Sequence, residues 1–234
     1  MIPLVVVTHP DRLTRARELL AATGGQALVI DPGNRGCVST HLDAYRVLHS
    51  VALTAPGVQW VCALEDDAVP VPGFTDQLAQ VAAATPSPIT SLYLGRGRPV
   101  HWQSSIAQVI APVDADPHFL LGSSMLHTVG LLIAVEWLER LIDWMEQSFR
   151  HYPGCVELDG LWSYFLQEMA LTAAYTRPSL VDHDDEIPSV IPVSAREDGE
   201  ERTEKRVAWL ADARESWEMT TAVIPTPTLL FHGR

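Results

Sequence analysis

Apolar residues along most of the chain fall into short runs that alternate with stretches of helical spacing. Runs bounded by turn residues predict buried strands over residues 4–7, 27–30, 60–64, 89–94 and 106–113. Apolar positions three or four apart predict helices over residues 37–53, 73–84, 135–149 and 161–169, after a first helix that starts near Pro10 and stops at Gly24. Residues 114–124, which contain Pro117 and Gly122, are expected to be irregular.

This alternation predicts an α/β fold in which a mostly parallel central sheet is flanked by helices, beginning with a Rossmann-like strand, loop and helix. The length of 234 residues suits one domain, which we place over residues 1–193. Residues 194–234 then form a C-terminal extension that we expect to pack on or near the active site. Within it, residues 207–217 predict a helix and residues 222–231 an extended stretch that Pro225 and Pro227 interrupt.

Three consecutive acids follow the run at residues 60–64: Glu65, Asp66 and Asp67, ahead of a turn rich in Pro and Gly. The carboxyl ends of the strands face the ligand crevice in open α/β sheets. Neighbouring carboxylates repel one another, and a hard cation such as Mg²⁺ or Mn²⁺ relieves that repulsion while bridging to phosphate oxygens. The alternative is a solvated acidic turn. Asp31 closes the strand at residues 27–30 in the same way and is also a binding candidate.

Composition narrows the classes of function. The formal charge of −13, from 16 Lys and Arg against 29 Asp and Glu, argues against a partner that is a nucleic acid. No transmembrane segment and no signal peptide are predicted, so we expect a cytoplasmic protein. The three cysteines are widely spaced and are expected to be buried thiols. Neither a dinucleotide-binding glycine fingerprint nor a P-loop is present.

A second acidic pair, Glu157 and Asp159, precedes the amphipathic stretch at residues 161–169. A helix N-terminus favours negative charge, so Asp159 is explicable as a helix cap. Downstream of the strand at residues 89–94, Arg96 and Arg98 lie on a glycine-rich loop, where a guanidinium group can bind phosphate or carboxylate; a solvent-exposed turn is the alternative.

Several segments together resemble one known family. Residues 63–74, ALEDDAVPVPGF, resemble the Asp-x-Asp-type metal motif of GT-A fold glycosyltransferases, in particular bacterial and phage-encoded enzymes related to family 25. Residues 36–48, GCVSTHLDAYRVL, resemble the helix that borders the donor pocket in those enzymes. Residues 127–133 and 178–183 resemble a glycine-containing strand and a late histidine motif of the same family.

The resemblance implies a role for each of these positions. It implies a Mn²⁺ or Mg²⁺ ion held by Asp67, by Asp66 or Glu65, and by His183, with His232 as the alternative histidine. Asp159 is implied as the general base, with Glu157 as its rival. The residues that it implies near the nucleotide-sugar donor are Thr8, His9, Arg12, Glu65, Asp66, His127 and Gly130, with His41 and Asp43 lining the pocket.

The predicted function is therefore metal-dependent transfer of a sugar from a nucleotide-diphosphate sugar to a hydroxyl acceptor, which is a glycan, a lipopolysaccharide-like molecule or a protein. A base at Asp159 implies inversion of the anomeric centre; if Asp159 is only a cap, a retaining route stays open. One alternative is a nucleotidyltransferase, although that class usually brings a glycine-rich loop after the first strand, where this chain has THPDR. The other is a non-catalytic carbohydrate-binding or assembly protein.

Overall fold

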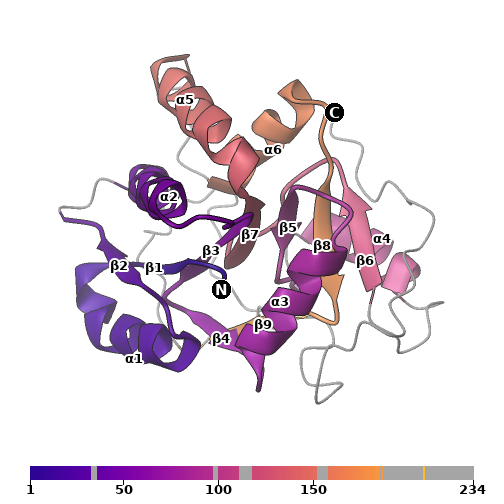
Figure 1. Ribbon diagram of the computed structural model, residues 1–234. Helices are drawn as coiled ribbons and strands as arrows, with labels where there is room; N and C mark the ends of the chain where they lie inside the picture. Colours follow the sequence, from indigo (N-terminus) through magenta and orange to yellow (C-terminus); the bar gives the residue numbers. More distant parts are fainter. Residues whose placement is uncertain are drawn as a thin grey trace.

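A seven-stranded sheet forms the centre of the computed structural model, which describes residues 1–32, 36–96, 100–110, 118–151, 158–184, 186 and 208 (Figure 1). The strand order is β2-β1-β3-β7-β5-β8-β6. The strands are β1 (Leu4–Thr8), β2 (Ala27–Ile30), β3 (Trp60–Glu65), β5 (Ile89–Ser91), β6 (His118–Gly122), β7 (Gly130–Ala134) and β8 (Ala173–Arg177). All of them run in one direction except β6 and β7, so the predicted mostly parallel α/β sheet is confirmed.

Helices cover both faces of the sheet (Figure 1). They are α1 (Leu13–Thr23), which follows the 3₁₀ turn η1 (Pro10–Arg12), α2 (Cys37–Thr54), α3 (Phe74–Ala84), α4 (Val100–Ile110), α5 (Val135–His151) and α6 (Leu158–Glu168). Val5 and Val7 of β1 pack in one core with α2, α5 and α6, whereas Leu4 and Val6 pack in the other with α1 and α3. Burial on both faces explains why β1 is an unbroken apolar run.

The carboxyl edge of the parallel strands collects the polar residues. Val7 pairs with Glu65 and Thr8 pairs with Ile30, so β1, β2 and β3 end side by side. Strand β7 runs antiparallel to β3, with Leu64 opposite Gly130, and it therefore starts at the edge where β3 ends. Residues that precede β7 consequently face the residues that end β3.

A second, two-stranded sheet extends this edge. Strand β4 (Ala68–Pro70) pairs antiparallel with β9 (Val181–His183), and Ala68 lies opposite His183. The amide of Asp184 donates to the carbonyl of Asp67 over 2.8 Å. This pairing brings the late histidine of the chain next to the acids that end β3.

Two predicted elements are wrong. Residues 106–113 were expected to form a strand, but α4 occupies residues 100–110. Trp102 and the buried Ile106 are four residues apart, which is the spacing of one helix face. A short apolar run alone does not distinguish a helix from a strand. Residues 114–124 were expected to be irregular, but β6 occupies residues 118–122, because Gly122 bounds the strand and does not exclude it. Residues 111–117 lie outside the described ranges.

Among the described residues, no helix is long and apolar enough to cross a bilayer. The predicted elements at residues 207–217 and 222–231 lie outside the described ranges apart from Ala208. Ala208 is buried, forms an antiparallel bridge with Gly95, and donates from its amide to Asp182 Oδ1 over 2.6 Å. Through Ala208 the C-terminal segment contacts the strand that carries His183.

The first testable prediction concerns Gly130, at the start of β7, where there is little room for a side chain. A Cβ atom there would lie 3.1 Å from Leu64 Cδ2 and 3.1 Å from Val181 Cγ2. We expect Gly130→Val to lower the free energy of unfolding by about 1–3 kcal/mol, the usual cost of overpacking a core. Urea unfolding measures the change. The matched control is Gly160→Ala in α6, where nothing lies within 4 Å of the added atom; a comparable loss in that variant would contradict the packing explanation.

Candidate functional site

The buried carboxylate of Asp66 holds the loop after β1 against the end of β3. Thr8 Oγ1 donates to Asp66 Oδ2 over 2.7 Å, and the His9 amide donates to the same oxygen over 3.2 Å. Arg12 donates to the other oxygen, Oδ1, over 2.8 Å. Both oxygens of Asp66 are therefore engaged by the chain itself, and three of the predicted donor-binding residues are the groups that engage them.

Asp67 lies beside His183, as the register of β4 and β9 requires. Asp67 Oδ2 is 3.3 Å from His183 Nε2 and 3.4 Å from the Arg12 guanidinium group. Both Asp67 and His183 are buried. The Tyr93 ring packs near His183, with the ring centroids 6.3 Å apart. A carboxylate and an imidazole from distant parts of the chain thus present ligand atoms to one point.

Arg15 is a member of the site that the sequence analysis missed. Its Nε donates to the carbonyl of Asp66 over 2.9 Å, and its NH1 group lies 2.8 Å from Asp184 Oδ2. Arg15 therefore connects the end of β3 to the residue that follows β9. The signal was available in the sequence, because residues three apart at the start of a helix share a face, and Arg15 is three residues after Arg12.

Thr128 connects two carboxylates on the other side of β3. Its Oγ1 lies 2.8 Å from Glu65 Oε1 and 3.0 Å from Asp159 Oδ1. A hydroxyl group has one hydrogen to donate, so it cannot donate to both carboxylates at once. In the protein without a cation, the second contact requires a proton on one of the two acids.

Glu65 is the acid whose environment favours that proton. Burial raises the pKa of Glu65 to about 8, with the charge of Asp67 as the next cause and the charges of Asp159 and Asp66 adding to it, while the Thr128 hydrogen bond lowers it. A protonated Glu65 donates to Thr128, which then donates to an ionised Asp159. With the protons in these places, each of the two contacts of Thr128 Oγ1 is a hydrogen bond with one hydrogen.

The first turn of α2 faces Glu65. His41 Nε2 lies 3.5 Å from Glu65 Oε1, and His41 Nδ1 lies 2.9 Å from the carbonyl oxygen of Cys37 and 3.4 Å from its Sγ. Burial lowers the pKa of His41 to about 4, and burial together with the charge of Glu65 raises the pKa of the Cys37 thiol well above its usual value. Without a cation this is a neutral thiol beside a neutral imidazole, which is unlike a reactive cysteine.

Four other residues predicted for the site, Asp31, His127, Gly130 and Asp43, contact groups other than the acids at the end of β3. Asp31 Oδ2 accepts from the Gly36 amide over 3.2 Å at the start of α2. The His127 ring packs edge-on against Tyr93, with centroids 4.9 Å apart, while Gly130 is enclosed by core side chains. Asp43 pairs with Arg46 over 2.7 Å, and both side chains are partly exposed.

Glu157, Arg98 and His232 lie outside the described ranges, so the rivals to Asp159 and His183 stay predictions. Asp159 itself lies in the first turn of α6, partly buried, with its side chain toward Thr128.

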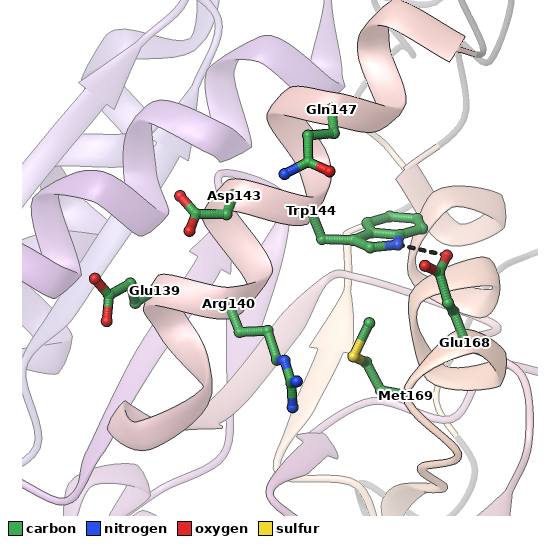
Figure 2. A pocket seen from close by; sticks show the side chains of 7 residues that line it. All are labelled: Glu139, Arg140, Asp143, Trp144, Gln147, Glu168 and Met169. Carbon is green, nitrogen blue, oxygen red and sulfur yellow. Dashed lines mark hydrogen bonds between the residues drawn. The ribbon is translucent and has the colours of Figure 1, made fainter.

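A hollow of about 380 Å³ lies elsewhere on the protein, between α5 and the end of α6 (Figure 2). The Trp144 indole donates to Glu168 Oε2 over 2.7 Å at one side of it. The residues that line it are Glu139, Arg140, Asp143, Trp144, Gln147, Glu168 and Met169. None of the acids at the end of β3 lines this hollow. Its mixed surface charges form no converging set of ligands, so we place the candidate site at the carboxyl edge of the sheet.

No model of a known protein family matches the chain, and no curated protein is significantly similar to it in sequence. Solved structures that are similar to the chain include the following three. The protein A197 from STIV is 10% identical, with a TM-score of 0.44 over 78% of this chain and 85% of that one. A glycosyltransferase involved in the glycosylation of the major capsid of PBCV-1 is 10% identical, with a TM-score of 0.29 over 73% of this chain and 91% of that one. Mannose-1-phosphate geranyltransferase from Thermus thermophilus is 13% identical, with a TM-score of 0.34 over 73% of this chain and 57% of that one. At these values, function has to be inferred from the chain's own site residues.

The Arg12–Asp66 pair generates the second prediction. The side chains are 12% and 6% exposed, so Arg12→Ala leaves a buried carboxylate without its counter-charge. We expect the free energy of unfolding to fall by about 3 kcal/mol, the lower end of the usual cost of breaking a buried pair. Chemical unfolding followed by circular dichroism measures it.

Two further variants test the cause of that loss. Arg12→Ala combined with Asp66→Asn removes the unpaired charge and should recover part of the stability. Arg46→Ala breaks two exposed pairs, with Asp43 and Glu146, and should change stability by only about 0–1 kcal/mol. An equal effect of Arg46→Ala and Arg12→Ala would contradict the importance of burial.

Glu65 generates the third prediction, which concerns pH. Its pKa is raised in the folded protein to about 8, so the native state holds a proton that the unfolded chain releases from about pH 4.5 upward. The stability of the metal-free protein should therefore fall as the pH rises through that window. Glu65→Gln should lessen this fall and raise the melting temperature at about pH 9 by a few degrees. Thermal unfolding in a chelating buffer measures both, with the exposed Glu139→Gln as the control; identical pH profiles for the wild type and Glu65→Gln would contradict the assignment.

Proposed function

We propose that this chain is a divalent-metal-dependent glycosyltransferase of the GT-A type that transfers a sugar from a nucleotide-diphosphate sugar to a hydroxyl acceptor. The observation that carries the proposal is the convergence of Asp67 and His183, 3.3 Å apart, at the carboxyl edge of a mostly parallel sheet. That edge is where α/β sheets bind their ligands. The resemblance of residues 63–74 to the Asp-x-Asp motif supports the same function.

The donor set fits Mn²⁺ better than Mg²⁺. One carboxylate oxygen and one imidazole nitrogen lie at a separation that a shared metal ion can bridge, and imidazole is a ligand for Mn²⁺ more readily than for Mg²⁺. When bound, such an ion would neutralise the charge that develops on the leaving diphosphate. Asp67 and His183 are the residues that would hold it. Asp66 positions them, since its oxygens already accept hydrogen bonds from the loop after β1.

Arg12 and Arg15 place positive charge beside Asp66 and Asp67, which favours the binding of an anionic donor. Arg12 neutralises Asp66 and reaches Asp67 at 3.4 Å, which reduces the negative potential that a diphosphate would meet. Arg15 fixes the backbone of Asp66 and the side chain of Asp184, so that the ends of β3 and β9 stay together.

Asp159 is the proposed general base for the acceptor hydroxyl. Thr128 orients its carboxylate, and a protonated Glu65 behind Thr128 leaves Asp159 as the ionised member of the pair. Asp159 is partly exposed at the start of α6, so an acceptor can approach it. Removal of the acceptor proton by this residue while the diphosphate leaves on the other side would invert the anomeric centre.

The fourth prediction tests this function through donor binding. In the presence of Mn²⁺ and a panel of nucleotide-diphosphate sugars, one donor should stabilise the wild type by about 2.7 kcal/mol at 100 times its Kd. Asp67→Asn should lose most of this metal-dependent stabilisation, whereas Asp159→Asn should keep it and lose sugar transfer. Thermal shift and release of nucleoside diphosphate measure the two effects.

Asp76→Asn, an exposed acid in the first turn of α3, is the matched control and should behave as the wild type. Nucleoside triphosphates with sugar 1-phosphates form a second arm of the panel. Turnover in that arm alone would replace the proposal with a nucleotidyltransferase, and sugar binding that none of the variants affects would identify a non-catalytic protein.

A further inference from the structure

We propose that Cys37, His41 and Glu65 form a second cation site, of the zinc type, distinct from the Asp67–His183 pair. Each of the three side chains offers a ligand atom, and these atoms all lie within 4.8 Å of one another. Within the described part of the chain, this is the group of three such side chains that converges to that degree. The site predicted from the acidic triplet did not include Cys37.

The helix and the sheet build this cluster from two directions. Cys37 and His41 are four residues apart in the first turns of α2, so they lie on the same helix face. Glu65 is the last residue of β3, against which that face packs. The backbone therefore fixes two ligands from one rigid helix and the third from the central sheet, which is the arrangement that a preformed metal site needs.

His41 is in the tautomer whose unprotonated nitrogen, Nε2, faces Glu65. A carbonyl oxygen only accepts hydrogen bonds, so the 2.9 Å contact places the imidazole proton on Nδ1, donating to the Cys37 carbonyl. Nε2 then carries the lone pair and faces Glu65 Oε1 at 3.5 Å. Two ligand atoms bound tetrahedrally at about 2.0–2.1 Å are separated by about 3.4 Å, so Nε2 and Oε1 already lie at the separation of two ligands of one ion.

The chemical types of the three ligands indicate which metal ion the cluster would bind. A thiolate and an imidazole are ligands that zinc prefers, whereas Mg²⁺ takes oxygen ligands and dehydrates reluctantly. Three protein ligands leave one coordination position for water or a substrate oxygen, as in catalytic zinc sites. The two proposed sites therefore differ in chemical softness, and Mn²⁺ at Asp67 and His183 does not compete well for Cys37.

The surroundings of the cluster favour positive charge. Thr128 has a single hydrogen for Glu65 and Asp159. The charges of Asp66 and Asp67 also act on the Cys37 thiol. Arg12 pairs with Asp66 and Asp67, and Arg15 pairs with Asp184, so both of these cations are directed at other acids. Burial and the neighbouring acids raise the pKa of the Cys37 thiol in the metal-free state, and a bound dication would reverse that effect.

Cobalt binding to the full chain tests the proposal, because Co²⁺ substitutes for zinc and is visible. Titration of the purified, reduced protein with Co²⁺ should give a thiolate-to-cobalt charge-transfer band in the near ultraviolet that saturates at one equivalent and that Zn²⁺ removes. Cys37→Ala should abolish the band. His41→Gln should weaken cobalt binding by at least about 100-fold, since even a hydrogen-bond partner behind a ligand is worth about 10–100-fold.

Controls separate this site from the proposed glycosyltransferase site. His49→Gln, on the same helix but outside the cluster, should keep the wild-type affinity and spectrum. Asp67→Asn should keep the thiolate band even though it loses the effect of Mn²⁺ on donor binding. Circular dichroism confirms that each variant is folded. A wild-type cobalt complex without a thiolate band, or a band that survives in folded Cys37→Ala, overturns the proposal whether or not the chain binds a nucleotide sugar.

Discussion

The burial of Asp66 is the constraint on which the rest of this site depends. A carboxylate at the end of a central strand is stable there only because Arg12, Thr8 and the His9 amide meet both of its oxygens. Those contacts tie the loop after β1 to the end of β3, and they fix the backbone on either side of Asp66. Glu65 and Asp67, on either side of Asp66 in the chain, have different partners: Glu65 lies beside His41 and Thr128, and Asp67 lies beside His183.

The topology of the sheet then decides which residues each acid meets. Because β7 is antiparallel among parallel neighbours, the segment before it, with Thr128, arrives at the edge where β3 ends. Because β9 returns beside β4, His183 arrives opposite Ala68 and next to Asp67. Helices α2 and α6 both begin at this edge, so Cys37, His41 and Asp159 are carried there by helix first turns. Groups that are distant in sequence are therefore fixed in place by rigid elements and not by loops alone.

The apolar pattern was sufficient to predict β1, β2, β3 and the long helices, because burial on both faces leaves a continuous apolar run and a single buried face leaves a helical period. It was insufficient at α4 and β6, where short apolar runs are compatible with either structure. The acids at the end of β3 were also predictable. Thr128 was not, because its role follows from the register of β7 on β3, which no local pattern encodes. Arg15 was indicated only by its place three residues after Arg12 at the start of a helix.

Charge balance connects the two proposed cation sites. Arg12 compensates one of the two charges on Asp66 and Asp67, and Arg15 compensates Asp184, so a further positive charge or a proton is needed beside Glu65. In the metal-free protein a proton on Glu65 meets that need, consistent with its raised pKa of about 8. A zinc ion at Cys37, His41 and Glu65 would displace that proton and compensate the charge of Glu65 in its place. In both states the negative charge of Glu65 beside Asp159 is compensated, by a proton in one and by the metal ion in the other.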